Sequence, residues 1–337
     1  MLKKLRVLII VAIVVAILPI FVKDDYFIHT LVMALMFAYL ASSWNILGGF
    51  VGHFALGNGV YIGIGGYITA LLFKTNGISP WIGLIISAVL AGFLSLILSY
   101  PCFKLRGSYY VLSTVALLHA FRIVVMNEKT LFGYDTGSSQ GLRLPWRGGF
   151  INMQFESKLG YYYVIAAMLL VAIIISIYIK SSKNGFYFSA ITTNQEAAEA
   201  MGVNTTVYKL KAQFISAALT ALGGGFYVMF IMFLDPNRVL SYNFSVEIML
   251  YAVVGGLDTI WGPVIGAAVL YPVNEALRIS LGTSFTGLST AIYGLILMLV
   301  VYFMPGGVFP WIFKKISDIH RRKVKAVLQN EGGVPHV

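Results

Sequence analysis

Charged side chains are scarce in this sequence. They make up 11% of the 337 residues, whereas an ordinary soluble domain carries about a quarter. Apolar residues make up 58%, and the mean hydropathy is +0.83. This composition excludes a soluble globular domain and is typical of an all-α protein that crosses a membrane several times, in contact with lipid.

Cysteine is almost absent. The single Cys102 excludes an internal disulfide and a cysteine-based metal cluster, and we expect it to be a small apolar residue near a helix end. Acidic residues are also few, 13 against 24 basic ones, which gives a net charge of +11. The basic residues gather at the ends of apolar runs and in the tail, as membrane orientation requires, so we expect no nucleic-acid partner.

The sequence also lacks the motifs of nucleotide-binding and hydrolytic sites. A Walker A loop needs a glycine followed by Lys and then Ser or Thr, and no glycine here is followed in this way. Gly57-Asn58-Gly59 lacks the third glycine of a dinucleotide-binding turn, and no His-Glu-x-x-His or Ser/His/Asp pattern is present. We therefore expect a chain that is not an enzyme and has no metal site and no cofactor of its own.

What the sequence has instead is a series of long apolar runs. A membrane-spanning helix needs about 20 apolar residues. That rule predicts about ten spans, with eight or nine as alternatives because the run at 245–258 is short. The first run has no small-residue cleavage site after it, so we expect it to be retained. The predicted spans are 5–22, 29–47, 50–73, 81–101, 109–126, 160–180, 211–234, 245–258, 262–279 and 287–304.

The positions of Lys and Arg predict the orientation, because basic residues concentrate on the cytoplasmic side. With both termini in the cytoplasm, that side carries fifteen of the 24 basic residues. We therefore expect a permease domain at 1–313, an external segment at 127–159, a cytoplasmic loop at 181–210 and a basic cytoplasmic tail at 314–337. The fifteen are Lys3, Lys4, Arg6, Lys104, Arg106, Lys180, Lys183, Lys209, Lys211, Lys314, Lys315, Arg321, Arg322, Lys323 and Lys325.

A short polar helix is predicted inside that cytoplasmic loop. Thr193 lies three residues before Glu196, which is the spacing of a capping box. Ala197 and Ala198 favour helix, and Gly202 follows where a left-handed cap suits glycine. Such a helix buries little of itself, so it needs something outside the membrane to pack against. A helical loop without a partner is the plainer interpretation.

Glycine interrupts one apolar segment in each half of the chain. Gly49 and Gly57 belong to the first interruption, and Gly255 and Gly256 to the second. Paired interrupted helices in corresponding halves indicate a transport path near the middle of the membrane. Close helix packing through small residues is the alternative, and it is the safer interpretation of any single glycine.

Polar residues within the predicted spans are candidates for that path, because they are costly in lipid. Asn45, His53 and Asn58 flank the first glycine interruption and are the best candidates. The alternative is interhelical hydrogen bonding. A self-sufficient secondary transporter or channel would need acidic residues in mid-span, and only Glu247 approaches that position.

Several motifs in order resemble the permease family for branched-chain amino acids in ABC import systems. They begin with SWNILGGFVG at 43–52 and LRGSYY at 105–110. Glu196-Ala197-Ala198 with Gly202 is similar to the EAA---G loop, and VGGLDTIWGPVIGA at 254–267 and FMPGG at 303–307 follow. The similarity covers roughly residues 28–310, and the order of the motifs is more specific than any one of them.

The resemblance implies a permease subunit with two related halves that works by alternating access in the bacterial inner membrane. It implies a second, unlike permease chain, two ATP-binding subunits and an extracytoplasmic substrate-binding protein. The residues around Glu196 would form the coupling helix that docks on an ATP-binding subunit. Asp258 stands where the family has glycine, and His53 and Asn58 also depart from its pattern. Urea, short amides or other small amino acids therefore remain alternative substrates to leucine, isoleucine and valine.

Overall fold

The computed structural model describes residues 18–20, 24–128, 130–131, 134–135, 137–281, 286–304 and 306–311. Most of the predicted span at 5–22 and the tail at 314–337 lie outside these residues. Within them the chain is mainly helical, and the strands are two residues long. This agrees with the all-α class that the composition predicts.

Long apolar helices form the first part of the chain. The Asp24 carboxylate caps the first long helix by accepting from the Tyr26 N–H at 3.0 Å. Gly77, in a left-handed conformation, ends the second. The elements are η1 (Leu18–Ile20), α2 (Asp25–Gly48), α3 (Gly59–Asn76), α4 (Pro80–Cys102) and α5 (Ser108–Asn127).

The segment after α5 contains short elements instead of another span. Two antiparallel pairs form here: β1 with β2, and β3 with the distant β4 through Leu142↔Leu234. Gln154 holds the loop together, because its amide oxygen accepts from the Arg147 N–H at 2.6 Å. The elements are β1 (Thr130–Leu131), β2 (Tyr134–Asp135), η2 (Ser138–Gln140), β3 (Leu142–Arg143) and η3 (Phe150–Asn152).

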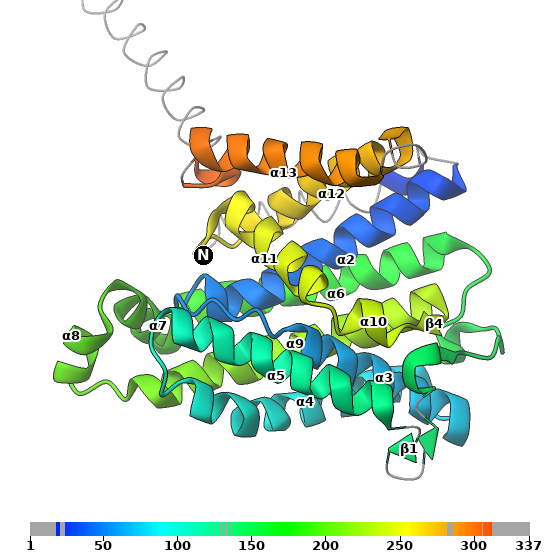
Figure 1. Ribbon diagram of the computed structural model, residues 1–337, viewed down its shortest axis with the longest axis horizontal. Coiled ribbons are helices and arrows are strands. Elements are labelled where there is room, and N and C mark those ends of the chain that lie inside the picture. The colour runs from blue at the N-terminus through cyan, green and yellow to red at the C-terminus, as the bar shows by residue number, and fades with distance from the viewer. Residues whose placement is uncertain are drawn as a thin grey trace, which may run out of the picture.

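The second part of the chain is again helical. Its elements are α6 (Lys158–Ser181), α7 (Lys183–Thr193), α8 (Gln195–Ala200), α9 (Thr205–Ile231), β4 (Phe233–Leu234), α10 (Pro236–Val239), α11 (Tyr242–Gly256), α12 (Gly262–Leu281) and α13 (Thr286–Phe303). Figure 1 shows α7 and α8 at one end of the long axis and β1 and β4 toward the other.

Among the residues that the structure describes, six helices are long and apolar enough to span a membrane, so the chain is a multi-pass membrane protein. They are α2, α4, α5, α6, α9 and α12. The sequence predicts a continuous span at 50–73, and this is wrong at its start, because α3 begins only at Gly59. Residues 51–57 form no helix, since Gly48 and Gly49 end α2 and Gly52 adopts a φ of +75°.

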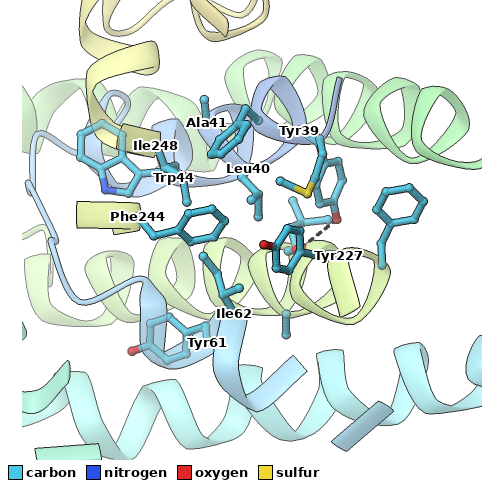
Figure 2. Close-up of a cluster of buried hydrophobic side chains, with 14 of the residues drawn as sticks. Tyr39, Leu40, Ala41, Trp44, Tyr61, Ile62, Tyr227, Phe244 and Ile248 are labelled. Atoms are coloured by element: carbon cyan, nitrogen blue, oxygen red, sulfur yellow. Dashed lines mark hydrogen bonds between the residues drawn. The ribbon is translucent and has the colours of Figure 1, made fainter. Parts of the chain in front are cut away.

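The core lies where α2 and α9 cross between the other helices. Of the most apolar part of α2, 89% is buried inside the protein. Figure 2 shows Tyr39 and Trp44 of α2 facing Ile62 of α3, Tyr227 of α9 and Phe244 of α11. The Tyr39 hydroxyl donates to the Leu219 carbonyl at 2.8 Å. These buried aromatic side chains fix the two interrupted regions relative to each other.

Candidate functional site

The α8 region begins with a cap that differs from the predicted one. α7 continues through Thr193, whose hydroxyl donates to the Ser189 carbonyl at 2.9 Å. Asn194 is the N-cap instead, and its side-chain oxygen accepts from the Ala197 N–H at 3.0 Å. The predicted capping box of Thr193 and Glu196 is therefore wrong, because the break between the helices falls one residue later.

The end of α8 matches the prediction. Gly202 has a φ of +85°, which glycine adopts without the steric cost that a side chain would add. Its N–H donates to the Glu199 carbonyl at 2.9 Å, and the Val203 N–H donates to Ala198 at 3.0 Å. Ala198 is buried, so this one position of α8 anchors the helix to the protein.

Polar side chains tie α8 to the start of α9. The Glu199 carboxylate accepts from the Thr205 hydroxyl at 2.6 Å and from the Gln195 amide at 2.8 Å. These hydrogen bonds, that from Thr205 foremost, lower the pKa of Glu199 below its ordinary value. Lys209 is buried in α9 and donates to the Gln195 side-chain oxygen at 2.8 Å. The helix is thus held at a fixed angle by side-chain bonds.

An ion pair connects α8 to the turn between α4 and α5. Arg106 and Glu196 approach to 2.9 Å, and their side chains are 72% and 76% exposed. Such an exposed pair adds little stability. It does border a cleft of about 500 Å³ between the turn, α8 and the segment after α2. His53 and Tyr110 line the same cleft, with their rings 5.3 Å apart.

The second candidate region is the pair of interrupted helices. α3 begins inside the protein, where the Gly59 N–H donates to the Ser245 hydroxyl oxygen of α11 at 3.0 Å. Asn58 stands just before α3, is buried, and makes no hydrogen bond through its side-chain nitrogen. Asn45 of α2 donates to the Thr259 carbonyl at 2.8 Å and so ties α2 to the second interruption.

The glycines of both interruptions lie where backbones almost touch. A side chain on Gly57 would meet the Thr114 backbone, and one on Gly255 would meet the Gly262 carbonyl. Gly49 lies under the Asn45 side chain, and Gly256 has a φ of +123°. The geometry gives these glycines a packing role. Their role in a transport path, and that of Asn45, His53 and Asn58, stays a prediction.

The structure adds residues that the sequence analysis did not single out. Arg106, Asn194 and Thr205 all hold α8, although Arg106 lies 90 residues from its partner. Asn194 was accessible from sequence, because asparagine before Gln195 is also a good cap. Glu247 lies inside α11, where its carboxylate accepts from the Tyr251 hydroxyl at 2.6 Å. Because the Glu247 carboxylate already has this hydrogen-bond partner within the described residues, it does not form a free ion-binding site.

The chain is similar to known permeases over most of its length. A family model described as the permease component of branched-chain amino acid transport systems matches residues 26–301. The high-affinity branched-chain amino acid transport system permease protein LivM of Salmonella typhimurium is 24% identical over 300 residues, 82% of this chain and 68% of that protein.

Two archaeal proteins are also similar. The probable branched-chain amino acid transport permease protein LivM of Methanocaldococcus jannaschii is 23% identical, over 74% of this chain and 78% of its own length. The probable branched-chain amino acid transport permease protein LivH of the same organism is 22% identical, over 80% of this chain and 84% of its own length. No solved structure gives a significant match.

Proposed function

This chain belongs to the family of permease components of branched-chain amino acid transport systems, and from that premise we propose that it is one permease subunit of an ATP-driven importer for leucine, isoleucine and valine. The observation that carries the proposal is the family match, which spans 26–301 and therefore both interrupted helices. The importer works by alternating access, and substrate enters from a binding protein at the outer face.

The partners follow from this role. The chain pairs with a second, unlike permease, and two further subunits bind and hydrolyse ATP, so the chain needs no cofactor itself. Similarity both to proteins called LivM and to one called LivH supports a pair of related permeases. Its location is the bacterial inner membrane, with both termini in the cytoplasm.

The coupling segment is 181–210, on the cytoplasmic side, within a permease domain of 1–313. Glu196, Ala197 and the capped end at Gly202 dock on an ATP-binding subunit. The support is physical: α8 is short and exposed, and it is anchored at Ala198 and by the bonds of Gln195 and Glu199 to α9. A helix that is held rigidly in this way can transmit movement of the docked subunit to the membrane-spanning helices. The external segment 127–159 lies at the far end and receives the binding protein.

The finer architecture is about ten spans in two related halves. The support is a repeated order. α2, α3, α4 and α5 are matched in order by α9, α11, α12 and α13. The packing repeats as well, since α4 packs on α9 and α12 packs on α2. The transport path passes the interruptions, near Asn45, His53 and Asn58 and the glycines Gly49, Gly57, Gly255 and Gly256.

The first test is purification of the tagged full chain in several mild detergents, with mass-spectrometric identification of the bound proteins. We expect a second permease and ATP-binding chains to co-purify. Membrane vesicles that contain the complex should then take up leucine only with internal ATP. Uptake of urea but not leucine would reassign the substrate. A chain purified alone, with uptake driven by an ion gradient, would replace the importer by a stand-alone transporter.

A further inference from the structure

The helix α5 presents an unusual surface. Only 17% of its most apolar part is buried inside the protein, the smallest share among the six candidate spans. Its exposed residues nevertheless include a histidine. We define the α5 face as a stripe at helical spacing that is exposed along its length. The α5 face consists of Leu112, Ala116, His119, Ala120 and Ile123.

His119 lies deep in the span. It is the twelfth residue of a helix of 20 residues, so it lies about 2 Å from the helix midpoint along the axis. Ionisable side chains at such a depth almost always face protein or a water-filled cavity, because lipid cannot hydrogen-bond them. Within the described residues, no hydrogen bond or ion pair reaches the His119 imidazole.

The basic side chain of α5, Arg122, is already satisfied. Arg122 donates to the side-chain oxygen of Asn237 at 2.8 Å, beside α10. The two residues are three apart, so they lie on adjacent parts of the helix surface, and only Arg122 turns toward this chain. His119 therefore has no polar partner among the described residues, and a polar group of another chain can supply one.

Neighbouring spans provide the comparison. On α4 the serines Ser87, Ser95 and Ser99 are all buried, and the exposed side chains Ile85 and Phe93 are apolar. On α6, Ser176 is buried in the same way. Those serines are hidden, while large apolar side chains of the same helices are exposed, as on a lipid-facing helix. The α5 face differs because the ionisable His119 is exposed on it near the middle of the span, where lipid offers no hydrogen-bonding partner.

We propose that the α5 face packs against the second permease subunit and that the His119 imidazole hydrogen-bonds to a polar group of that subunit. Ala116 and Ala120, four residues apart, let a partner helix approach closely enough for such a bond. This inference rests on the proposed function, because it requires an importer with two permease chains. The inference adds the surface through which the two permease chains contact each other.

The test uses the complete importer in its membrane. A photoreactive p-benzoyl-phenylalanine replaces Leu112 or Ile123, which are 63% and 61% exposed on the α5 face. The matched control replaces Ile85 on α4, which is 64% exposed. We expect irradiation to join this chain to the second permease from Leu112 and Ile123 but not from Ile85, with the adduct identified by mass spectrometry.

Several outcomes would overturn the inference. An adduct with residues 1–22 of the same chain would mean that its own N-terminal run covers α5. An adduct with a second copy would mean a homodimer contact, and attachment only to lipid would mean a lipid-facing helix. If the second permease co-purifies but reacts equally from Ile85, the inference fails while the proposed function stands. If no second permease co-purifies, the proposed function fails first.

A second measurement addresses His119 itself. His119→Leu should lower the amount of second permease that stays bound after detergent extraction by about threefold, the effect of one average interhelical hydrogen bond. His119→Gln keeps a hydrogen-bonding group and should retain most of the partner. Ile85→Ala is the control. Equal retention in His119→Leu and His119→Gln would contradict a hydrogen bond at this position.

Discussion

The α8 region and the contact between α11 and α12 are held together by different kinds of interaction. Around α8, polar side chains make the bonds: Arg106 donates to Glu196, and Thr205 donates to Glu199. At the crossing of α11 and α12, backbones meet directly, because Gly255 lies against the Gly262 carbonyl. The first kind of contact can be broken and remade at little cost in free energy. The second tolerates no added atom, so we expect mutations to separate folding from coupling.

The sharpest separation should come from Gly255→Ala. The added methyl group would overlap the Gly262 backbone, and overpacking of this kind costs about 3 kcal/mol of unfolding free energy. The measurement is the thermal unfolding midpoint of the purified chain. Gly294→Ala is the control, because nothing lies within 4 Å of the position that its new atom would take. Equal midpoints for the two variants would mean that the crossing is looser than its geometry indicates.

The cap of α8 should have a smaller and local effect. Asn194→Ala removes the side-chain acceptor for the Ala197 N–H and should cost the helix about 1 kcal/mol. Amide hydrogen exchange across 195–203 should quicken, and leucine uptake should fall while the unfolding midpoint of the whole chain stays unchanged. Thr193→Ala removes only a bond within α7 and should leave exchange in α8 as it was. If Thr193→Ala instead quickened exchange in α8 more than Asn194→Ala did, the predicted capping box of Thr193 and Glu196 would be correct after all.

The ion pair between Arg106 and Glu196 should matter less again for stability. Both side chains are exposed, so either single charge reversal should change the unfolding free energy by no more than about 0.5 kcal/mol. If the pair sets the angle of α8, uptake should fall in Arg106→Glu and in Glu196→Arg and recover in the double variant. Uptake that is normal in both single variants would remove this contact from the coupling role.

The pH dependence of α8 should be the smallest effect. Hydrogen bonds from Thr205 and Gln195 lower the pKa of Glu199, so the carboxylate is more acidic in the folded chain than in the unfolded one. Its contribution is therefore fully present above its ordinary pKa of 4.5 and is lost only as the pH falls through the lowered value. Protection of the backbone amides in 195–203 against hydrogen exchange should therefore fall over the same pH range. In Glu199→Gln the acid-dependent step should be absent.

The helix positions were accessible from the sequence because they depend on local properties. Apolar runs of about 20 residues place α4 at Pro80–Cys102 and α6 at Lys158–Ser181, close to the predicted 81–101 and 160–180. The glycine interruptions were also visible, although the first interruption was predicted as helix. Glycine lowers helix propensity without fixing where a helix restarts, so the start of α3 at Gly59 depends on its distant bond to Ser245.

The candidate site was predicted only in part. The sequence indicated the position of α8, its alanines and the left-handed Gly202, since each is a local preference. It placed the cap on Thr193 because Thr193 and Asn194 are both suitable capping residues, and the length of α7 decides between them. Arg106 pairs across 90 residues of chain, and no local pattern encodes a contact of that kind.

The hydrogen bond from Gly59 to Ser245 has a consequence for the way the protein is made. Its two residues are 186 positions apart. At about 5–20 residues per second, roughly 10–40 s of synthesis separates the emergence of one partner from that of the other. During this interval the Gly59 N–H at the start of α3 lacks the Ser245 acceptor, and α9 emerges only toward the end of the interval. We therefore expect ribosome-bound chains that stop before Ser245 to be cut by membrane proteases near residues 49–58, and chains that extend past α12 to resist them.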